Sequence, residues 1–575
     1  MISRTHYCGL INKKHINKKI TICGWVNNIR NLGKIKFIEI RDISGIIQAI
    51  TDKEIDIKKE YIICVKGIIV ERTKNTMTTS TQNSIELQVE ELIIINKTDE
   101  KLPFFPNEIN KINEEQSLKY RYIYLRQKIA SDKLILRSNV VHEIRKLLNK
   151  KNFLDIETPI LTRSTPEGAR EYVVPSRIEK YNFFSLPQSP QIFKQLLMIS
   201  GIDRYYQIAK CFRDEDLRSD RQPEFTQLDI EISFKNENFI MKLTENIIKT
   251  LFKKFTNIII PKKIKKLTYK KSMDLYGSDK PDLRNPLKIR NLKKLFKNDK
   301  DDIFYKYANK NYLISSIYAN DKDNKITTIN LSKYEKLVKE YKLNIFHFIK
   351  INTQNKETTS SLKDDITKKI LNYIKIDKNY NNENLIIIIA GEKNNLYNIL
   401  SKLRNDIGYD LNIISKSYSP IWIIKHPMFK WNNLNKKWES SHHPFTAPIM
   451  KKNTTTINPK NCLSNSYDIV MNGIELGGGS IRIHDAKTQE NVFKLLYTDS
   501  KKILKDFDFF LKALNSGAPP MGGLAIGLDR LLMIMTESKS IKDVIAFPKN
   551  QASHCPLTDA PSSIEKEKLK ELNLL

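Results

Sequence analysis

Five short strand patterns between residues 20 and 95 constrain the fold of this chain more than any other feature. They read ITICGWV, IKFIEIRD, GIIQAIT, YIICVKGIIV and SIELQVEELIII, and turns rich in Gly, Asn, Lys and Thr separate them. Glycine-interrupted strands packed into so short a segment are typical of a small closed barrel of the OB type. The sequence therefore predicts an N-terminal β-barrel domain over residues 1–105.

Aromatic and polar residues in this predicted barrel indicate what it binds. Trp25, Phe37 and Gln48 lie on or near its strand patterns. Such barrels bind single-stranded nucleic acid by stacking bases on aromatic rings over a basic groove. The alternative is that the rings belong to the core, and for Trp25 we favour the core.

The charge of the chain points to a polyanionic partner. Lys and Arg number 97 against 65 Asp and Glu, which gives a net charge of +32. Such an excess is typical of nucleic-acid-binding proteins. A membrane surface is the alternative, but the longest aliphatic run, at residues 385–390, is far too short to span a bilayer. We therefore expect nucleic acid and no membrane.

Cysteine usage and the N-terminus bear on location. The six cysteines are scattered without a C-x-x-C pair, which argues against structural zinc and against a disulfide framework. The N-terminal MISRTHYCGLINKKH has no apolar segment of the kind that a secretory signal needs. We expect a reducing, cytoplasmic environment.

Beyond the barrel, two motif-rich segments flank a motif-poor one. The proline-bracketed LPFFPNEIN marks a hinge over 106–130, and apolar residues at helical spacing predict a helix near 132–152, followed by a strand that ends at Thr158-Pro159. Residues 286–412 are rich in Lys, Asn and Ile and predict an inserted α/β domain. The flanking segments, 131–285 and 413–555, then form one domain, with a C-terminal extension at 556–575.

The segment CFRDEDLRSDRQPEFTQLDIEISF at 211–234 places a dense run of both charge signs between two strand patterns. A plain hairpin tip needs only a short turn such as Asn-Gly. The alternatives are a solvated, salt-bridged loop and a site that binds a charged ligand.

A helix pattern in QSPQIFKQLLMISG offers an amide and a cation. Ser189 fits the N-cap and Pro190 the first helical position, so that Gln191 and Lys194 share one face. Near a helix N-terminus this pair could bind a carboxylate. An ordinary exposed lysine is the alternative.

Two carboxylates flank bare backbone in YDIVMNGIELGGGSIRIHD. Asp468 and Glu475 fall on neighbouring strands beside the glycines at 477–479, and Arg482 follows on the next stretch. Glycines in strands often mark the close approach of a ligand. Because Mg²⁺ takes few protein ligands and bridges phosphates, the pattern fits a magnesium–nucleotide site. A salt-bridged strand pair is the alternative.

The segment GGLAIGLDRLLMIMTES reads as a glycine-rich strand that leads into a helix. It places Arg530 in the first helical turn, where the helix dipole disfavours a cation. Since no P-loop or dinucleotide-binding fingerprint is present, arginines would have to hold any phosphate. The histidines of HHPFT at 442–446 suggest a metal, but no further ligand lies at zinc spacing, so we expect no zinc.

These segments resemble known motifs in order. FRDED with EFTQLDIE, the strand ending at Pro159, and GLAIGLDR resemble the three signature motifs of class II aminoacyl-tRNA synthetases. With TPEGAR (165–170), QSPQIFKQ (188–195), GSDKPDLR (277–284), HHPFT and ELGGGSIRIH (475–484), the chain resembles bacterial-type aspartyl-tRNA synthetases along essentially its whole length. The resemblance implies a multidomain α+β fold with an OB barrel, a class II antiparallel-sheet catalytic domain and an inserted α/β domain.

The resemblance also implies roles at an ATP site. Arg213 grips the α-phosphate, Glu215 reads the adenine amino group, Phe225 stacks on the base, and Arg530 lies near adenine and the γ-phosphate. Arg213 and Arg530 are the implied catalytic residues, and Asp468 and Glu475 hold Mg²⁺. The other implied ATP-binding residues are Asp214, Gln222, Glu475, Gly527, Leu528 and Asp529.

The resemblance also implies a set of residues that bind the amino acid and the tRNA. Glu167, Gln191 and Asp229 surround the aspartate ammonium, while Arg482 and Lys194 meet its side-chain carboxylate. Arg213 and His442 complete this site. The enzyme would form aspartyl-adenylate from aspartate and ATP and pass aspartate to tRNA-Asp. Phe37 would stack on the anticodon beside Gln48, and the helix before Pro159 would build a homodimer.

Two other functions remain as alternatives. Asparaginyl- and lysyl-tRNA synthetases share the fold, but Arg482 and Lys194 disfavour an amide or ammonium ligand, which would leave a guanidinium unpaired or repelled. A non-catalytic, synthetase-like RNA-binding protein would be expected to lose some phosphate-handling residues, yet Arg213, Glu475 and Arg530 are present.

Overall fold

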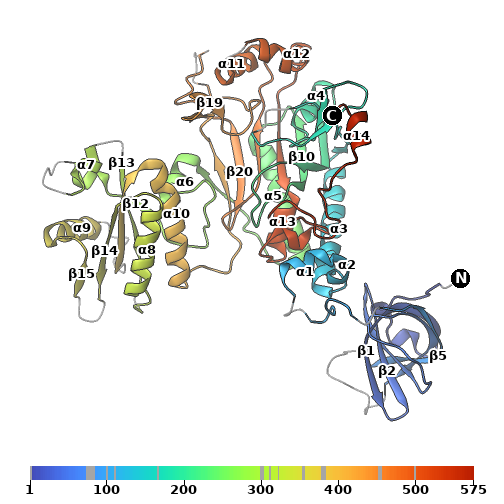
Figure 1. Ribbon diagram of the computed structural model, residues 1–575. Coiled ribbons are helices and arrows are strands. Elements are labelled where there is room, and N and C mark those ends of the chain that lie inside the picture. Colours follow the sequence, from blue (N-terminus) through green and yellow to red (C-terminus); the bar gives the residue numbers. More distant parts are fainter. Residues whose placement is uncertain are drawn as a thin grey trace. The chain divides into compact units, whose positions relative to one another are not determined.

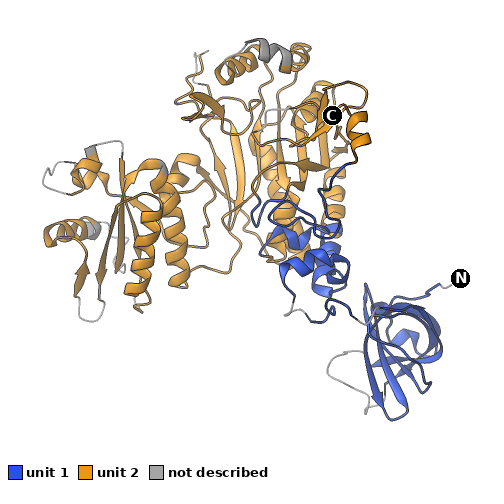
Figure 2. Cartoon of the chain, viewed as in Figure 1, with its two compact units in different colours: residues 1–138, 217–222, 539–564 blue, residues 139–216, 223–538, 565–575 orange. Residues whose placement is uncertain are grey.

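The protein is described here by a computed structural model. The described residues are 3–72, 84–98, 101–108, 112–164, 168–297, 303–309, 312–321, 323–352, 357–376, 384–450, 456–497 and 500–575. The chain forms two compact units (Figure 2): residues 1–138, 217–222 and 539–564 make the first, and 139–216, 223–538 and 565–575 the second. Each is described by itself.

The first unit contains a closed five-stranded barrel with the strand order β1-β2-β3-β5-β4 (Figure 1). All five predicted strands are present, and the first runs further than expected and is bulged between Val26 and Asn28. The bounds are β1 Lys19–Leu32, β2 Ile35–Asp42, β3 Gly45–Thr51, β4 Ile62–Glu71 and β5 Ile85–Asn96. The predicted barrel is confirmed.

Alternation along the strands sorts the barrel residues into a core and an outer face. Ile38, Ile40, Ile47 and Ala49 belong to the buried apolar core. Because successive side chains of a strand point to opposite faces, the residues between them lie on the outer face. Phe37 on β2 and Gln48 on β3 are therefore outside the core, although both are buried. Trp25 alternates with the core residues of β1 and is only half-buried, so our assignment of Trp25 to the core is wrong.

Two short helices of the first unit are tied to its C-terminal segment. They are α1 (Glu114–Lys119), which begins with a capping box at Asn113, and α2 (Arg121–Tyr124). Arg121 is buried and donates hydrogen bonds to the backbone carbonyls of Lys542, Ile545 and Ala546. A guanidinium with its donors satisfied in this way holds two distant parts of the sequence together.

The second unit is built on an eight-stranded sheet with the order β11-β17-β20-β21-β22-β10-β9-β6. Both end strands pair in parallel and the pairs between them are antiparallel. The bounds are β11 Lys265–Thr268, β17 Pro420–Ile424, β20 Ser466–Met471, β21 Ile474–Ile481, β22 Met521–Gly527, β10 Glu224–Ser233, β9 Arg204–Phe212 and β6 Leu154–Asp155. Strands from both sides of the predicted insertion thus share one sheet.

Helices and two small hairpins complete this part of the chain. An aromatic cluster of Phe445, Phe493, Phe507 and Phe510 packs with Ile192 of α4 and anchors the HHPFT segment. The bounds are α3 Lys128–Asn149, α4 Gln191–Ile199, α5 Glu237–Thr256, α6 Tyr269–Tyr276, α11 Ala486–Leu496, α12 Ser500–Asn515, α13 Leu528–Met535, α14 Lys566–Glu571, β7 Val173–Pro175, β8 Phe183–Ser185, β18 Phe429–Asn432 and β19 Lys437–Ser440.

Two boundaries differ from the sequence-based prediction. The strand expected to end at Pro159 ends at Asp155, although it does form the sheet edge, where a following proline is tolerated. Helix α4 begins one residue later than expected, because Pro190 occupies its N-cap position with ψ 28 and makes no side-chain cap hydrogen bond.

The insertion forms its own five-stranded antiparallel sheet with the order β12-β13-β16-β14-β15 (Figure 1). Buried Arg404 donates to the carbonyls of Asp282, Asn285 and Leu287 and fixes the entry to this sheet. The bounds are β12 Ile289–Asn291, β13 Tyr312–Ala319, β14 Ile345–Ile351, β15 Thr358–Ser360, β16 Leu385–Glu392, α7 Tyr305–Asn309, α8 Thr328–Glu340, α9 Asp364–Ile376 and α10 Lys393–Asp410.

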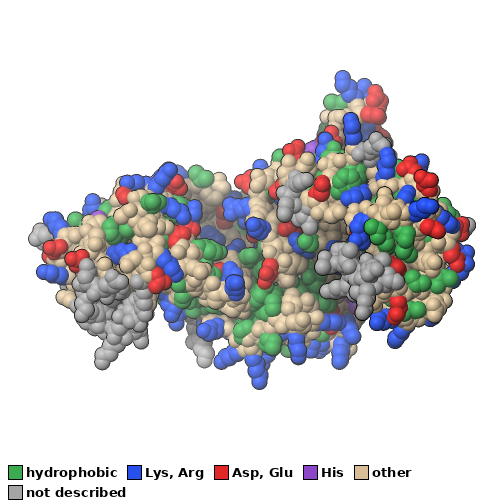
Figure 3. Space-filling model, turned by 90° about the horizontal axis from the view of Figure 1, so that it is seen from below, with side chains coloured by type: hydrophobic (Ala, Val, Ile, Leu, Met, Phe, Trp, Pro, Cys, Tyr) green, Lys and Arg blue, Asp and Glu red, His purple; other side chains and the backbone are tan. Residues whose placement is uncertain are grey.

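Lys and Arg side chains occur across the whole face shown in Figure 3, interspersed with fewer acidic ones. On this face, the basic side chains are therefore spread out and not gathered into one patch. Among the described residues, no helix combines the length and apolar character needed to cross a membrane.

Candidate active site

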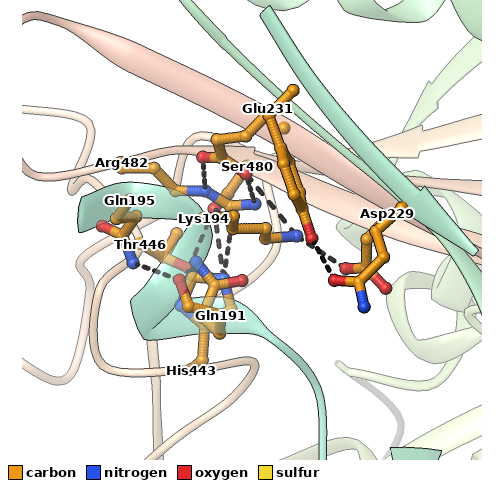
Figure 4. Close-up of polar contacts among 12 residues, drawn as sticks. Gln191, Lys194, Gln195, Asp229, Glu231, His443, Thr446, Ser480 and Arg482 are labelled. Carbon is orange, nitrogen blue, oxygen red and sulfur yellow. Dashed lines mark hydrogen bonds and ion pairs between the residues drawn. The ribbon is translucent and has the colours of Figure 1, made fainter. Parts of the chain in front are cut away.

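Four buried charges form the centre of the candidate site (Figure 4). Lys194 Nζ lies 2.9 Å from Asp229 Oδ1 and 3.5 Å from Glu231 Oε2. Arg482 forks onto Glu231, with Nε 2.8 Å from Oε1 and Nη2 3.0 Å from Oε2. None of the four side chains is more than 1% exposed. Two cations and two carboxylates balance in a place where an unpaired charge would be costly.

Strand geometry explains how the sequence brings these charges together. Asp229 and Glu231 alternate on β10 and so point to the same face of the sheet. Lys194 comes from α4, which packs on β10, and Arg482 directly follows β21. Gly523 of β22 pairs with Glu231, and a Cβ at Gly523 would lie 1.9 Å from Glu231 Oε2 and 2.2 Å from the Ile230 carbonyl oxygen. Only glycine fits there.

The remaining donor nitrogen of Arg482 is held by polar neighbours. Nη1 lies 2.6 Å from His443 Nε2 and donates to Ser480 Oγ at 2.7 Å. Burial and the adjacent guanidinium lower the pKa of His443 well below its ordinary value, so that its ring is neutral and Nε2 accepts the hydrogen bond. Burial alone would lower the pKa of Arg482, but Glu231 raises it. The site therefore keeps a charged guanidinium beside a neutral imidazole.

Three buried polar atoms in and around this cluster have no hydrogen-bond partner among the residues that the structure describes. They are Gln191 Nε2, a donor, and Asp229 Oδ2 and Gln195 Oε1, both acceptors. Leaving such groups unsatisfied costs about 1–3 kcal/mol each, so native sites usually reserve them for water or a ligand. The cluster can accept both an acidic and a cationic ligand group.

A second group of polar residues lies on β20 and β21. Asp468 and Glu475 flank Gly478, where a Cβ would lie 2.5 Å from Asp468 Oδ1 and 3.8 Å from Glu475 Oε1. Asp468 Oδ1 has no partner in the described part of the chain, whereas Glu475 pairs with Lys280 at 2.7 Å. Burial alone would raise the pKa of Asp468, but His442 and His426 hold it below its ordinary value. This carboxylate stays ionised and can bind a cation.

The glycines beside these carboxylates serve the sheet as well. A Cβ at Gly477 would lie 2.2 Å from the Ala525 carbonyl oxygen, and one at Gly479 equally close to that of Gly523. We predicted that the glycines mark a ligand. At Gly477 and Gly479 the neighbouring strand already requires them, and only Gly478 faces the carboxylates.

The expected ATP arginines lie on the second and third motifs. Arg213 places its guanidinium carbon 5.1 Å from the centre of the Phe225 ring, and its Nε is buried without a hydrogen-bond partner among the described residues. Arg530, in the first turn of α13, donates from Nη1 to the Glu475 carbonyl at 3.1 Å. Asp529 Oδ2 accepts the Thr226 backbone N–H at 2.8 Å, which links the two motifs.

Four other residues predicted to bind ATP lie on the same two motifs. Asp214 pairs with exposed Arg170 at 3.6 Å, and Glu215 is half-buried in the same loop. Gly527 is the N-cap of α13 and Leu528 is buried. Gln222 belongs to the first compact unit, where its amide makes two hydrogen bonds with the backbone of Lys549. Glu167 lies outside the described residues.

The histidines of HHPFT divide between the two groups. Sequence reasoning assigned His442 to the amino-acid site, but His443 contacts Arg482, and the ring of His442 lies 4.7 Å from that of His426. Burial lowers the pKa of His442, partly offset by Asp468. A strand-alternation argument could not have separated these neighbours, because both lie in a loop.

Several site residues were missed from the sequence. Glu231 could have been found, since it shares a strand face with Asp229. Lys280 and His426 were not singled out, because their partners come from distant segments. Ser480 could have been found, since its partner Arg482 lies only two residues later. In the barrel, Gln48 donates to Glu86 at 2.7 Å and accepts from Arg30 at 2.9 Å, so both ends of its amide are already engaged.

Comparisons with known proteins identify the family and the fold. A family model described as tRNA synthetases class II (D, K and N) matches residues 113–551, and one for the OB-fold nucleic acid binding domain matches residues 20–95. A crystal structure of an aspartyl-tRNA synthetase from Leishmania major Friedlin superposes with a TM-score of 0.58 at 19% identity, over 96% of this chain and 95% of that one. That likeness concerns the fold alone, and it confirms the predicted fold class.

Curated relatives match over their full lengths. The aspartate–tRNA(Asp/Asn) ligase of Legionella pneumophila strain Paris is 42% identical over 99% of this chain and 98% of its own. The aspartate–tRNA ligase of Buchnera aphidicola from Baizongia pistaciae is 44% identical over 98% of this chain and 99% of its own. The chain therefore belongs to the class II tRNA synthetases of the D, K and N group and, within them, to the aspartate–tRNA ligase family.

Proposed function

We propose that the protein activates L-aspartate with ATP, releases pyrophosphate and transfers the aspartyl group to the 3′ end of tRNA-Asp. The α-carboxylate of aspartate attacks the α-phosphorus in line, and no protein nucleophile is needed. Positioning and charge stabilisation then supply the catalysis. Family membership supports this reaction, and its substrates make the cytoplasm the expected location.

The observation that carries the proposal is a pair of unpartnered atoms beside two buried cations. Asp229 Oδ2 can accept a hydrogen bond from the aspartate ammonium, and Gln191 Nε2 can donate one to a carboxylate. Arg482 and Lys194 supply positive charge for the side-chain carboxylate. Since Glu231 already occupies the guanidinium fork, the ligand would approach through Nη1, now bonded to His443 and Ser480. A lysine ligand would add a third cation to this cluster.

ATP fits the second group of residues. Arg213 has an unused N–H for a phosphate oxygen and a ring beneath it on which adenine could stack. Mg²⁺ suits Asp468 and Glu475, because an ionised, unpartnered carboxylate oxygen faces the space that Gly478 leaves open. When bound, the ion would supply positive charge to the phosphates. Lys280 and Arg530 already bring positive charge to Glu475 and its backbone.

The reaction is tested by aspartate-dependent ATP–pyrophosphate exchange with aspartate, asparagine and lysine in parallel. We expect exchange with aspartate and none above background with the other two, because either would leave a buried charge unpaired or repelled. Exchange that favours asparagine or lysine, or no exchange with any of them, would contradict the proposal.

The tRNA would bind at the barrel, with Phe37 stacking on an anticodon base. The outer-face position of Phe37 and the match to the OB-fold nucleic acid binding model support this. We propose that the enzyme is selective for tRNA-Asp. Leu32, at the end of β1, resembles the residue found in the aspartyl-tRNA synthetases that charge tRNA-Asp alone. The Legionella relative is named for both tRNA(Asp/Asn), so charging of the two tRNAs side by side decides. Comparable aspartylation of both would overturn selectivity.

A homodimer is proposed, with the helix before Pro159, α3 (Lys128–Asn149), at its interface together with the segment around Pro159. Leu154, Ile160 and Leu161 are each about half exposed there. Ile160 also lines a cavity of about 490 Å³, together with Pro159, Arg145 and residues 207–210 of strand β9. Exposed apolar side chains around a cavity are typical of an interaction site. Light scattering should give twice 67.1 kDa, and a monomer at micromolar concentration would contradict the dimer.

A further inference from the structure

Three side chains from separate segments converge beside β20. They are His426, which follows β17, His442 of the HHPFT segment, and Asp468 of β20. One ligand atom from each, an imidazole nitrogen or a carboxylate oxygen, lies within 4.8 Å of the other two. Of these contacts, His426 Nε2 to Asp468 Oδ2 is 3.2 Å. No linear spacing reveals this group, because 16 and 42 residues separate His442 and Asp468 from His426.

Two members of the group, His426 and Asp468, are buried, and His442 is half-buried. His426 is only 3% exposed, and its Nε2 has no geometrically sound hydrogen bond among the described residues. The other ring nitrogen, Nδ1, lies 3.0 Å from Ser466 Oγ, and Ser464 Oγ lies 2.8 Å from that hydroxyl. A partner on one nitrogen that orients the ring and leaves the other nitrogen open is how proteins prepare a metal-binding histidine.

The ligand types determine which ion fits. Two imidazoles and one carboxylate suit Zn²⁺ and its neighbours in the transition series, whereas Mg²⁺ prefers oxygen ligands. Ligand atoms about 2.0–2.1 Å from a tetrahedral ion lie about 3.4 Å apart, close to the distance between His426 and Asp468.

We infer that His426, His442 and Asp468 bind a divalent transition-metal ion of the Zn²⁺ class, with a fourth position left open. Asp468 uses its two oxygens differently: Oδ2 faces His426, whereas Oδ1 faces the open space beside Gly478. The transition-metal site therefore adjoins the position proposed for Mg²⁺ without coinciding with it. Its existence does not depend on the proposed reaction.

Co²⁺ is the probe, because tetrahedral Co²⁺ absorbs strongly in the visible whereas octahedral Co²⁺ does so weakly. The full-length protein is stripped with a chelator and titrated with CoCl₂ in the absence of ATP, aspartate and Mg²⁺. We expect a tetrahedral spectrum that saturates at one ion per chain and is abolished by stoichiometric ZnCl₂. We also expect a higher Tm with Zn²⁺, since an ion that binds only the native state stabilises it.

Variants assign the site. His426→Gln and His442→Gln should each weaken Co²⁺ binding by at least about tenfold, since loss of even an outer partner costs about 10–100-fold. His142→Gln, which removes an exposed imidazole on α3, is the matched control and should bind like the wild type. If His426→Gln does not fold by circular dichroism, His442→Gln carries the test, because His442 lies in a loop.

Two results would overturn the inference. One is a wild-type protein that gives only the weak octahedral spectrum. The other is a tetrahedral spectrum that both histidine variants retain, which would place the ion elsewhere. Neither result depends on ATP–pyrophosphate exchange, so failure of this inference is distinguishable from failure of the proposed function.

Discussion

The buried cluster of the catalytic sheet and the outer face of the barrel both carry charged side chains on strands, but they satisfy them differently. In the sheet, Lys194 and Arg482 are matched by two carboxylates with almost no exposure. On the barrel, neutral Gln48 sits between Arg30 and Glu86, and the Arg30 side chain remains 36% exposed. The first region balances full charges in a dry site, and the second links them through an amide.

This difference shows what each region can recognise. In a balanced, buried cluster, a charged ligand must replace an existing ion pair. Removal of one charged side chain from such a cluster leaves an uncompensated charge. On the barrel, a ring such as Phe37 can stack on a base without any change of charge. We therefore expect the sheet to decide which amino acid reacts and the barrel to affect only tRNA.

The largest effect is expected at Arg482. Arg482→Leu leaves Glu231 with Lys194 as its remaining cation and the cluster with one uncompensated negative charge, and breaking a buried pair costs about 3–5 kcal/mol. Exchange kinetics should show a collapse of kcat/KM for aspartate with a much smaller change in the KM for ATP. Arg163→Leu, which breaks an exposed pair with Asp506, is the control and should behave like the wild type. Unchanged KM and kcat for aspartate in Arg482→Leu would show that this cluster does not recognise the amino acid.

Arg213 should come next. Arg213→Ala removes a donor proposed to stabilise charge on the phosphates, and the loss of one such donor costs about 2.7–4 kcal/mol of barrier. Aspartate-dependent exchange should nearly vanish while the unfolding curve stays close to that of the wild type, because Arg213 is only partly buried. Arg530→Ala should act in the same way. Near wild-type exchange in Arg213→Ala would break the assignment of this region to ATP.

A smaller effect, confined to the barrel, is expected at Phe37. Phe37→Ala should weaken tRNA binding by about 1–3 kcal/mol, the value of one stacked base, and leave exchange untouched. Ile38→Ala is the matched control, because the adjacent side chain is fully buried in the barrel core. It should lower stability by about 2–5 kcal/mol instead. A variant at Phe37 that behaves like the one at Ile38 would make Phe37 a structural residue.

The smallest effect concerns Arg30. If its partly exposed guanidinium meets a tRNA phosphate, Arg30→Ala should reduce the slope of log affinity against log salt by roughly 0.7. Lys339→Ala on α8, where Lys339 pairs with Glu335, serves as the control. Equal slopes for the wild type and Arg30→Ala would mean that the Arg30 guanidinium does not contact a phosphate of the tRNA.

Local patterns predicted the barrel and several elements around the motifs, but no individual element of the insertion. The five barrel strands and the helix now bounded at Lys128–Asn149 follow from period-two and helical spacing, which act within one segment. The split sheet was inferred because its motifs resume after the insertion. What local patterns could not give is the pairing of side chains across segments, such as Glu231 with Arg482 and Lys280 with Glu475.

The positions of His442 and Trp25 depend on their surroundings in the fold. His442 and His443 are adjacent in sequence, and the loop that carries them is anchored where Phe445 packs among the aromatic rings of α11 and α12. For Trp25 we favoured the core. The bulge between Val26 and Asn28 lies one residue away, and the ring is covered in part by Arg126 instead.

The glycines on β21 and β22 have a consequence for directed evolution of substrate choice. A side chain at Gly479 or Gly523 would collide with backbone as well as with neighbouring side chains, so shrinking Glu231 would not open either position. A mutant library that diversifies these glycines would consist largely of misfolded members. New substrates are better sought by varying Asp229, Glu231 and Arg482 together, because any single change among them leaves the others with an unmatched charge. Natural variants of this protein should likewise retain glycine at positions 479 and 523.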